Sequence, residues 1–191
     1  MAQPDAGGGA RRGDTRARAL AVALRMFAER GYANTSLREI ADRLGVTKAA
    51  LYFHYRSKDD LLAAILREYV DDLGDLLDDA AHRPASPATG EWLLRELAQQ
   101  RGRWGSDLLR LIRQNYAEIS RLPVVADMRQ AHRRLLLALS GPGADLADRV
   151  RAQAALVALE GPVLLPGDDD DEQATRAAAL AVALEIVRAR P

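Results

Sequence analysis

Polar, aromatic and basic side chains are concentrated between Thr47 and Lys58, in the run TKAALYFHYRSK. Ammonium, imidazole, phenol and hydroxyl groups at this density can donate hydrogen bonds to phosphate oxygens and to the edges of bases. The two lysines of the chain, Lys48 and Lys58, both lie in this run. These residue types therefore indicate the binding of a nucleic acid.

Two short helices joined by a tight turn are expected to position these groups. Ser36 precedes Glu39 by three residues, which is the spacing of a capping box at a helix start. Apolar residues then recur at helical spacing up to Leu44. Gly45 follows, at a point where a chain leaving a helix often needs a positive φ. The pattern predicts a first helix that ends at a glycine corner.

The second helix is expected to begin at Thr47, whose hydroxyl can cap it. Ala50 and Leu51 are predicted to face the core, and Tyr55 to close the core at the helix end. The two helices together form a helix-turn-helix. Its outer side would carry Lys48, Ala49, Tyr52 and His54.

A third helix start follows at Ser57, which can cap a long helix beginning at Lys58. The free backbone N–H groups at such a start can hold a phosphate, and the Lys58 ammonium adds a positive charge beside them. Two helix starts and several hydrogen-bond donors thus lie close together in the sequence.

The charge distribution supports a nucleic-acid partner. The chain has no net charge, but residues 11–58 hold eleven Lys and Arg residues against four Asp and Glu residues, a net charge of +7. The remaining residues therefore carry −7. A basic region of this kind is the electrostatic footprint expected for contact with phosphates.

These residues resemble the DNA-binding domain of the TetR family of bacterial transcriptional regulators. The resemblance covers about a quarter of the chain and rests on the motifs Phe27…Gly31-Tyr32, Ile40-Ala41…Leu44-Gly45-Val46 and Leu51-Tyr52…Tyr55…Ser57-Lys58. It implies that the helix from Thr47 enters the major groove, with Lys48 and Ala49 near base edges. The residues that it implies for DNA contact are Arg38, Thr47, Lys48, Ala49, Tyr52, His54 and Lys58.

The rest of the chain reads as helices, so the predicted fold class is all-α with about nine helices. We expect a disordered arm at 1–13, the DNA-binding domain at 14–57, and a helical regulatory and dimerisation domain at 58–191. Loops are expected at 82–90 and 161–167, where proline and glycine cluster. The predicted helices of the second domain are 58–80, 91–101, 106–121, 123–140, 144–160 and 171–190.

The last two predicted helices carry small apolar residues that permit close helix packing, so we expect them to form a homodimer interface as a four-helix bundle. A dimer would read two half-sites, usually a palindrome. The alternative is that these residues fill an intramolecular core. The expected interface residues are Val150, Ala154, Val157, Ala178, Ala181, Val182 and Leu184.

Aromatic and isolated polar residues of the second domain indicate a small-molecule pocket. The resemblance implies that an inducer bound there releases the protein from its palindromic operator. The alternative for the polar residues is that backbone groups or water satisfy them. The expected pocket residues are Tyr69, Trp92, Trp104, Asn115, Tyr116, Met128 and His132.

The sequence lacks the patterns of other functional classes. It contains no cysteine, no nucleophile elbow and no phosphate-binding glycine loop, so we expect neither an enzyme nor a cofactor. The five acidic residues at 168–172 lack the spacing of a calcium loop and suit a helix start. No run of about twenty apolar residues is present, so we expect no membrane span and a cytoplasmic protein.

Two alternatives to a ligand-responsive repressor remain open. An architectural DNA-binding protein would bind with little sequence preference and a steep dependence on salt. A helical protein-interaction module would retain the helix-turn-helix without binding DNA.

Overall fold

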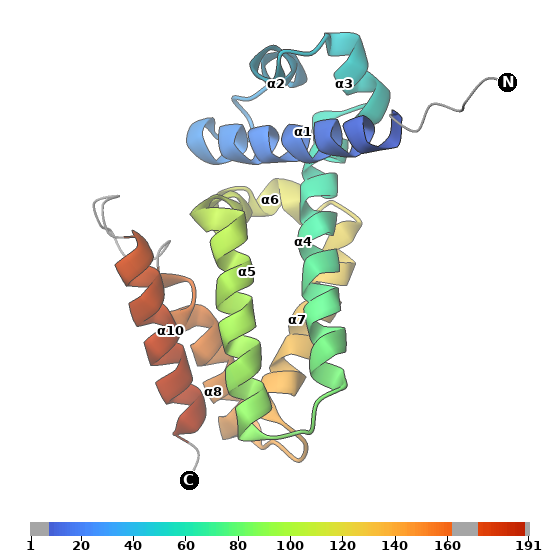
Figure 1. Ribbon diagram of the computed structural model, residues 1–191. Coiled ribbons are helices and arrows are strands. Elements are labelled where there is room, and N and C mark those ends of the chain that lie inside the picture. Colours follow the sequence, from blue (N-terminus) through green and yellow to red (C-terminus); the bar gives the residue numbers. More distant parts are fainter. Residues whose placement is uncertain (1–7, 162–171, 190–191) are drawn as a thin grey trace, which may run out of the picture. The chain divides into compact units, whose positions relative to one another are not determined.

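The computed structural model describes residues 8–161 and 172–189, and every regular element in these two ranges is a helix (Figure 1). The predicted all-α fold class is thereby confirmed. The chain forms two compact units, one of residues 1–67 and 111–122 and the other of residues 68–110 and 123–191. The start of the fourth helix and the segment 111–122 thus belong to the unit that contains the helix-turn-helix.

The first unit is built around a small core to which each of its helices contributes. The Phe27 ring meets the Tyr32 ring edge-on at a centroid distance of 5.1 Å, and Ile40 and Leu61 are fully buried. The unit contains α1 (Gly8–Arg30), α2 (Leu37–Leu44), α3 (Lys48–His54), the start of α4 (Lys58–Ala81) and the short α6 (Tyr116–Ile119).

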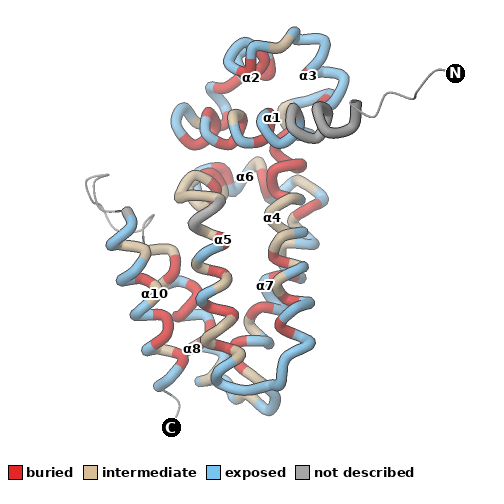
Figure 2. The backbone as a smooth tube through the Cα atoms, in the orientation of Figure 1, coloured by how far each residue is buried: buried red, intermediate tan, exposed pale blue. Residues whose placement is uncertain are grey.

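The second unit is an arrangement of longer helices around a core of leucine and alanine. Its α8 packs against both α7 and α10. Figure 2 shows buried and exposed residues alternating along α10, as expected for a helix with one face in a core. The unit contains the rest of α4, most of α5 (Pro87–Gln114), α7 (Val124–Ser140), α8 (Leu146–Ala158) and α10 (Glu172–Arg188).

The first helix begins earlier than predicted. Residues 1–13 were expected to form a disordered arm, but α1 starts at Gly8, so the part of the arm from residue 8 onward is helical. Helix propensity does not account for this extension, because the stretch GGARRG contains three glycines beside one alanine and two arginines. Residues 1–7 lie outside the described part of the chain.

The fifth helix also differs from the prediction. It begins at Pro87 rather than near Glu91, because Ser86 caps it by accepting a hydrogen bond from the Thr89 backbone N–H at 3.3 Å. The expected break is found at Gly105, where φ is 69° and ψ is 178°. The next helical stretch, which was predicted to reach Arg121, is interrupted at Asn115, whose side-chain N–H₂ donates to the Leu111 carbonyl at 2.9 Å. Such side-chain bonds to the backbone compete with a continuous helix.

The remaining predicted helices are present with ends shifted by a few residues. Pro123 precedes α7, as expected, and a capping box of Asp145 and Asp148 opens α8. The predicted loop at 161–167 falls almost entirely outside the described residues, as does the acidic run up to its last member, Glu172. Within the described ranges, no helix is long and apolar enough to cross a membrane.

Candidate DNA-binding interface

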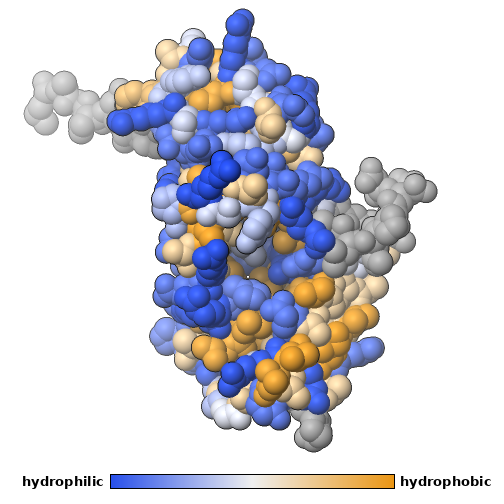
Figure 3. Space-filling view, turned by 180° about the vertical axis from the view of Figure 1, so that it is seen from behind, coloured by the Kyte–Doolittle hydropathy of each residue, from blue (hydrophilic) through white to orange (hydrophobic). Residues whose placement is uncertain are grey.

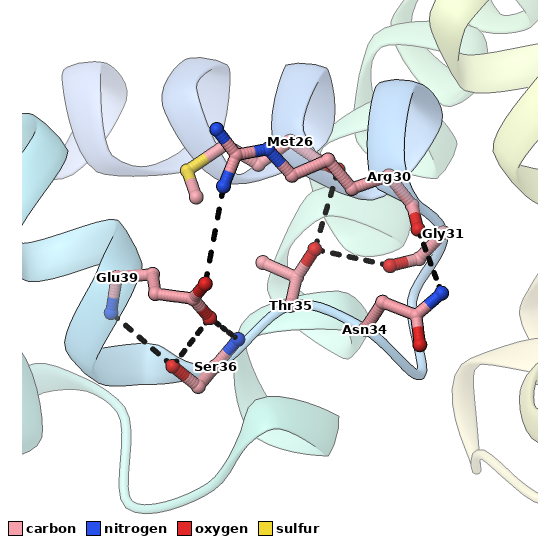
Figure 4. A network of polar contacts seen from close by, with 7 residues as sticks. All are labelled: Met26, Arg30, Gly31, Asn34, Thr35, Ser36 and Glu39. Atoms are coloured by element: carbon pink, nitrogen blue, oxygen red, sulfur yellow. Dashed lines mark hydrogen bonds and ion pairs between the residues drawn. The ribbon is translucent and has the colours of Figure 1, made fainter.

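The turn from α1 into α2 is held by short-range hydrogen bonds (Figure 4). The Ser36 hydroxyl accepts a bond from the Glu39 backbone N–H at 3.2 Å, and the Ser36 N–H donates to the Glu39 carboxylate at 2.8 Å. The buried Thr35 hydroxyl lies 3.0 Å from the Gly31 carbonyl oxygen. Hydrogen bonds from Ser36 hold the pKa of Glu39 below its usual range. The capping box predicted from the sequence is therefore present.

The corner between α2 and α3 is formed by Gly45, as predicted. Its φ of 71° and ψ of 28° lie in the left-handed region, which costs glycine little. The Val46 backbone N–H donates to the Ala41 carbonyl at 3.1 Å and closes the end of α2. This local geometry sets the direction in which α3 leaves.

α3 is a seven-residue helix that is almost entirely exposed. The Thr47 hydroxyl accepts a hydrogen bond from the Ala50 backbone N–H at 3.1 Å and so caps the helix. Leu51 is its buried residue, and Tyr55 is buried just after its end, as predicted. Ala50, which was predicted to face the core, is exposed instead. Within α3 the Leu51 side chain is the buried anchor, and the remaining positions face solvent.

The exposed side of α3 carries the groups predicted for DNA contact. Lys48, Ala49, Tyr52 and His54 are all exposed, and Arg38 on α2 is exposed as well. The Lys48 ammonium lies 5.0 Å from the centroid of the Tyr52 ring, the distance of a cation–π pair. Phe53, to which the sequence analysis gave no role, is 85% exposed on the same short helix. Its ring is available for an apolar contact.

The start of α4 is tied to the α1–α2 turn. The Ser57 hydroxyl accepts from the Asp60 backbone N–H at 3.0 Å, which confirms the predicted cap. The Lys58 ammonium donates to the Tyr32 carbonyl at 2.6 Å and to the Ala33 carbonyl at 3.3 Å. An ammonium has three N–H donors, so these two carbonyls leave one donor of Lys58 unused.

Tyr32 completes this connection. Its hydroxyl donates a hydrogen bond to the Asp59 carboxylate, and its ring lies under the Lys58 ammonium at 4.2 Å from the centroid. Burial, together with the bond to Asp59, raises the pKa of the Tyr32 phenol. The phenol therefore stays protonated and keeps its donor role at physiological pH.

A groove of about 430 Å³ runs between the α1–α2 turn and the start of α4. Tyr52 and Lys58, both predicted for DNA contact, line it. Asn34, Ser36 and Arg56 also line it and were missed. Arg56 could have been predicted from the sequence, because it is a basic residue within the polar run after α3. The groove offers the basic side chains of Arg56 and Lys58, beside the Glu39 carboxylate, which also lines it. Basic side chains of this kind suit a phosphate backbone.

The structure brings together one pair of the residues expected in a ligand pocket. The rings of Tyr69 and Trp104 meet edge-on at 6.1 Å, and the Trp104 indole N–H donates to Asp72 at 2.9 Å. Trp92 instead stacks on the Arg83 guanidinium at 3.7 Å. The other expected pocket residues are found elsewhere: Met128 is half-buried on α7, exposed His132 lies 3.0 Å from Gln153, and Asn115 and Tyr116 belong to the first unit.

Two polar groups of α5 near Trp104 were missed by the sequence analysis. Gln100 is 3% exposed, and its side-chain oxygen has no hydrogen-bond partner among the described residues. The same holds for the Nε of Arg101, whose Nη1 donates to the Leu156 carbonyl at 3.1 Å. Buried polar atoms without partners are uncommon and often mark a place for water or a ligand.

An exposed apolar face covers α8 and α10. Leu146, Val150 and Val157 are 75%, 60% and 43% exposed along one side of α8, and Val182 on α10 is 47% exposed. Orange side chains gather on this lower part of the molecule in Figure 3. Of the seven residues expected at a dimer interface, six are exposed: Val150, Ala154, Val157, Ala178, Ala181 and Val182.

Leu184 is the exception among the expected interface residues. It is 5% exposed and belongs to the core of the second unit, together with Ala183 and Val187. At about 100° per residue, Leu184 lies on the opposite side of α10 from Ala178 and Val182. Because α10 is apolar on both sides, the sequence does not show which side is buried and which is exposed.

Known proteins resemble the chain most clearly in its N-terminal part. Residues 19–65 match the family described as bacterial regulatory proteins, tetR family. The chain is 40% identical over 85 residues to the HTH-type transcriptional regulator AcrR of Shigella flexneri, which is 44% of this chain and 38% of that protein. It is 38% identical over 73 residues to the HTH-type transcriptional repressor KstR2 of Rhodococcus jostii, covering 38% of this chain and 36% of the repressor. The matches thus span little more than a third of these curated relatives.

Solved structures extend the likeness to the fold of nearly the whole chain. The ketosteroid transcriptional regulator KstR2 of Mycobacterium tuberculosis has a TM-score of 0.68 at 21% identity, over 89% of this chain and 93% of that one. A TetR transcription regulator from Haloarcula marismortui has a TM-score of 0.64 at 25% identity, over 93% of this chain and 98% of the other. Residues 19–65 of this chain thus match the tetR family of bacterial regulatory proteins, and its fold agrees with that of a solved TetR transcription regulator.

Proposed function

We propose that the protein is a sequence-specific DNA-binding transcriptional regulator that acts as a homodimer and responds to a small molecule. The observation that carries the proposal is the exposure of α3, which buries Leu51 and presents basic and aromatic side chains to solvent. A helix of this kind fits the major groove of DNA. Repression is the proposed sign of regulation, as in the KstR2 repressor, although the HTH-type transcriptional activator FasR of Mycolicibacterium smegmatis is 43% identical over 72 residues.

The proposed contacts divide into two kinds. Lys48 at the start of α3 is proposed to reach base edges, beside the small Ala49. The groove between the α1–α2 turn and α4 is proposed to hold a phosphate, through Tyr52, Arg56 and the remaining donor of Lys58. Thr47, His54 and Arg38 are proposed to contact the backbone nearby. Phosphate contacts fix the position of the protein, and base contacts select the sequence.

The exposed face of α8 and α10 supports the homodimer. Large apolar side chains such as Leu146 and Val150 are exposed along it, and burying them against a second copy is favourable. Pairs of helices from two subunits would form a four-helix bundle. A two-fold dimer would then bind a palindrome with one α3 in each half-site.

Selection of genomic DNA fragments on the purified protein at physiological salt tests the proposed function. We expect an enriched palindrome, and Tyr52→Ala should weaken binding to it while circular dichroism shows an unchanged fold. Tyr116→Ala is the control, because it removes a tyrosine of the same unit that is 69% exposed, compared with 40% for Tyr52. Retention without a common motif would favour an architectural protein, and no retention of DNA would favour an interaction module.

Sedimentation of a charged variant tests the dimer. Val150→Asp places a carboxylate in the proposed interface and should shift the protein to a monomer. Ala126→Asp, at an exposed position of α7, should leave the mass unchanged. A wild-type protein that sediments as a monomer at micromolar concentration would contradict the dimer.

A further inference from the structure

A cavity of about 430 Å³ lies in the second unit, at the end formed by the α4–α5 connection and the end of α7. Its volume is within the range of small-molecule sites. None of the aromatic or polar residues expected in a ligand pocket lines it. Its walls come from the end of α4 (Leu77, Ala80, Ala81), the segment 83–90, the end of α7 with Gly141 and Pro142, and Val187 of α10.

The walls of the cavity are mainly apolar. Leu77, Leu139 and Val187 are 3%, 2% and 6% exposed and belong to the core of the second unit. Leu137, by contrast, is 66% exposed at the cavity. An apolar molecule in the cavity would cover Leu137 and rest on the three buried side chains, and removal of this surface from water would favour binding.

The charged residues of the lining are both cationic. Arg83 and Arg134 contribute to the cavity, whereas no aspartate or glutamate is among the described residues that line it. Arg83 is held flat over the Trp92 ring at 3.7 Å, and Arg134 is anchored to Asp78 at 2.5 Å. A guanidinium has five N–H donors, so each arginine keeps donors for a ligand.

The start of α5 adds to the positive character of the cavity. Pro87, Thr89 and Gly90 line it, and this helix has no acidic residue in its first turn. The first turn of α4, by comparison, carries Asp59 and Asp60. The positive end of the α5 dipole is thus not compensated by a carboxylate of its own first turn.

We propose that this cavity binds an organic anion with an apolar body. The anionic group would be held by the guanidinium groups of Arg83 and Arg134, and the apolar body would lie against Leu77, Leu139 and Val187. Arginine forks suit carboxylates and phosphates alike. A role for this anion as the regulatory ligand rests on the proposed function, whereas its binding does not involve the first unit.

Calorimetric titration of the full-length protein with decanoate tests the site. Decanol and decyltrimethylammonium, which have the same apolar chain, are the uncharged and cationic comparisons. We expect decanoate to bind with the highest affinity and the cation with the lowest. Equal affinity for decanoate and decanol would overturn the anionic part of the proposal.

Two pairs of variants locate the binding. Arg134→Gln should weaken decanoate binding about three- to tenfold, because it removes a charge-assisted hydrogen bond. Arg133→Gln, the neighbouring exposed arginine that does not line the cavity, should have no effect. Ala138→Phe should fill the cavity and abolish binding, whereas Ala126→Phe on the same helix should not.

Binding at another surface would be recognised by a different pattern. If Arg134→Gln and Ala138→Phe fold correctly and bind decanoate with unchanged affinity, the proposal that it binds in this cavity is wrong. Affinity that falls in Leu146→Gln instead would assign binding to the exposed face of α8. Trp92 fluorescence in a Trp104→Phe background gives a second readout, since a ligand that engages Arg83 should alter the emission of the stacked indole.

A separate titration distinguishes this proposal from the proposed function. If the protein binds no DNA, the proposed function as a regulator is wrong. The calorimetric titration would still show whether the cavity binds the anion. A protein that binds its operator equally well with and without saturating decanoate would remove the regulatory role of the anion.

Discussion

α3 of the first unit and α10 of the second use their surfaces in opposite ways. α3 has seven residues, buries Leu51 and leaves the rest exposed, so local caps at Thr47 and Gly45 determine its direction. α10 has seventeen residues and divides between a core side with Leu184 and an exposed apolar side with Val182. Hydrogen bonds within a few residues of α3 position that helix, whereas α10 is positioned by packing against other helices. Changes in the two units should therefore differ in kind.

The largest effects are expected in the two cores. Ile40→Ala in the first unit and Leu156→Ala in the second each remove a side chain that is no more than 2% exposed. Each should lower the free energy of unfolding by about 2–5 kcal/mol, through lost burial and the cavity left behind.

Chemical denaturation followed by circular dichroism measures these changes, and tryptophan emission separates the units because Trp92 and Trp104 both belong to the second. We expect Ile40→Ala to shift the circular dichroism transition more than the tryptophan transition. Coincident shifts in both signals would show that the two units unfold together. The two units would then not differ in stability.

The next effect concerns base reading by the exposed side of α3. Lys48→Ala should reduce discrimination between the operator and altered sites by about 1–3 kcal/mol, as expected for a lost base contact. Competition binding with single-base variants measures it, and Arg133→Ala in the second unit is the control. A uniform loss of affinity on all sequences would mean that Lys48 contacts phosphate.

A smaller effect should follow from the corner before α3. Gly45→Ala meets no atom within 4 Å, so its cost is the positive φ of 71° alone. We expect a loss of about 1 kcal/mol in the free energy of unfolding. Gly74→Ala, within α4 and also without a neighbour within 4 Å, is the comparison, and it should stabilise the protein slightly. Equal changes in the free energy of unfolding for the two variants would show that a side chain at position 45 does not strain the backbone.

The smallest effect is a dependence on pH in the capping box. The pKa of Glu39 is lowered in the folded protein by its bonds to Ser36, so the folded state favours the charged carboxylate. This stabilisation is present above the pKa of the unfolded chain and is lost as pH falls through the lower folded value. The difference in unfolding free energy between wild type and Glu39→Ala should therefore shrink in acid. A difference that is constant from neutral to acidic pH would contradict this contribution.

The same contrast explains which parts of the structure could be predicted. The helix-turn-helix depends on Ser36, Glu39, Gly45 and Thr47, whose roles follow from spacing alone, and each was found as expected. The exposure of Ala50 was not foreseen, because alanine fits either environment. The kink at Gly105 was expected, but the interruption at Asn115 depends on a side-chain bond that spacing does not show.

The surfaces of the second unit were harder to predict because they depend on pairs of distant segments. Arg83 reaches Trp92, and Arg134 reaches Asp78 across 56 residues, so the cavity between them has no signature in the sequence. Of the aromatic residues expected to share one pocket, Tyr69 and Trp104 meet, whereas Trp92 packs against Arg83 and Tyr116 belongs to the first unit. Composition indicated what kinds of side chain were present but not which would meet.

The different surroundings of the two lysines have a practical consequence for covalent labelling. Lys48 is exposed on α3, whereas Lys58 donates two hydrogen bonds to backbone carbonyls and is covered by the Tyr32 ring. An amine-acylating dye should therefore modify Lys48 faster than Lys58, as peptide mass mapping after brief exposure would show. Because the chain contains no other lysine, Lys48 is the side-chain amine best suited to carry a reporter on the helix proposed to enter the major groove, once the N-terminal α-amine has been blocked.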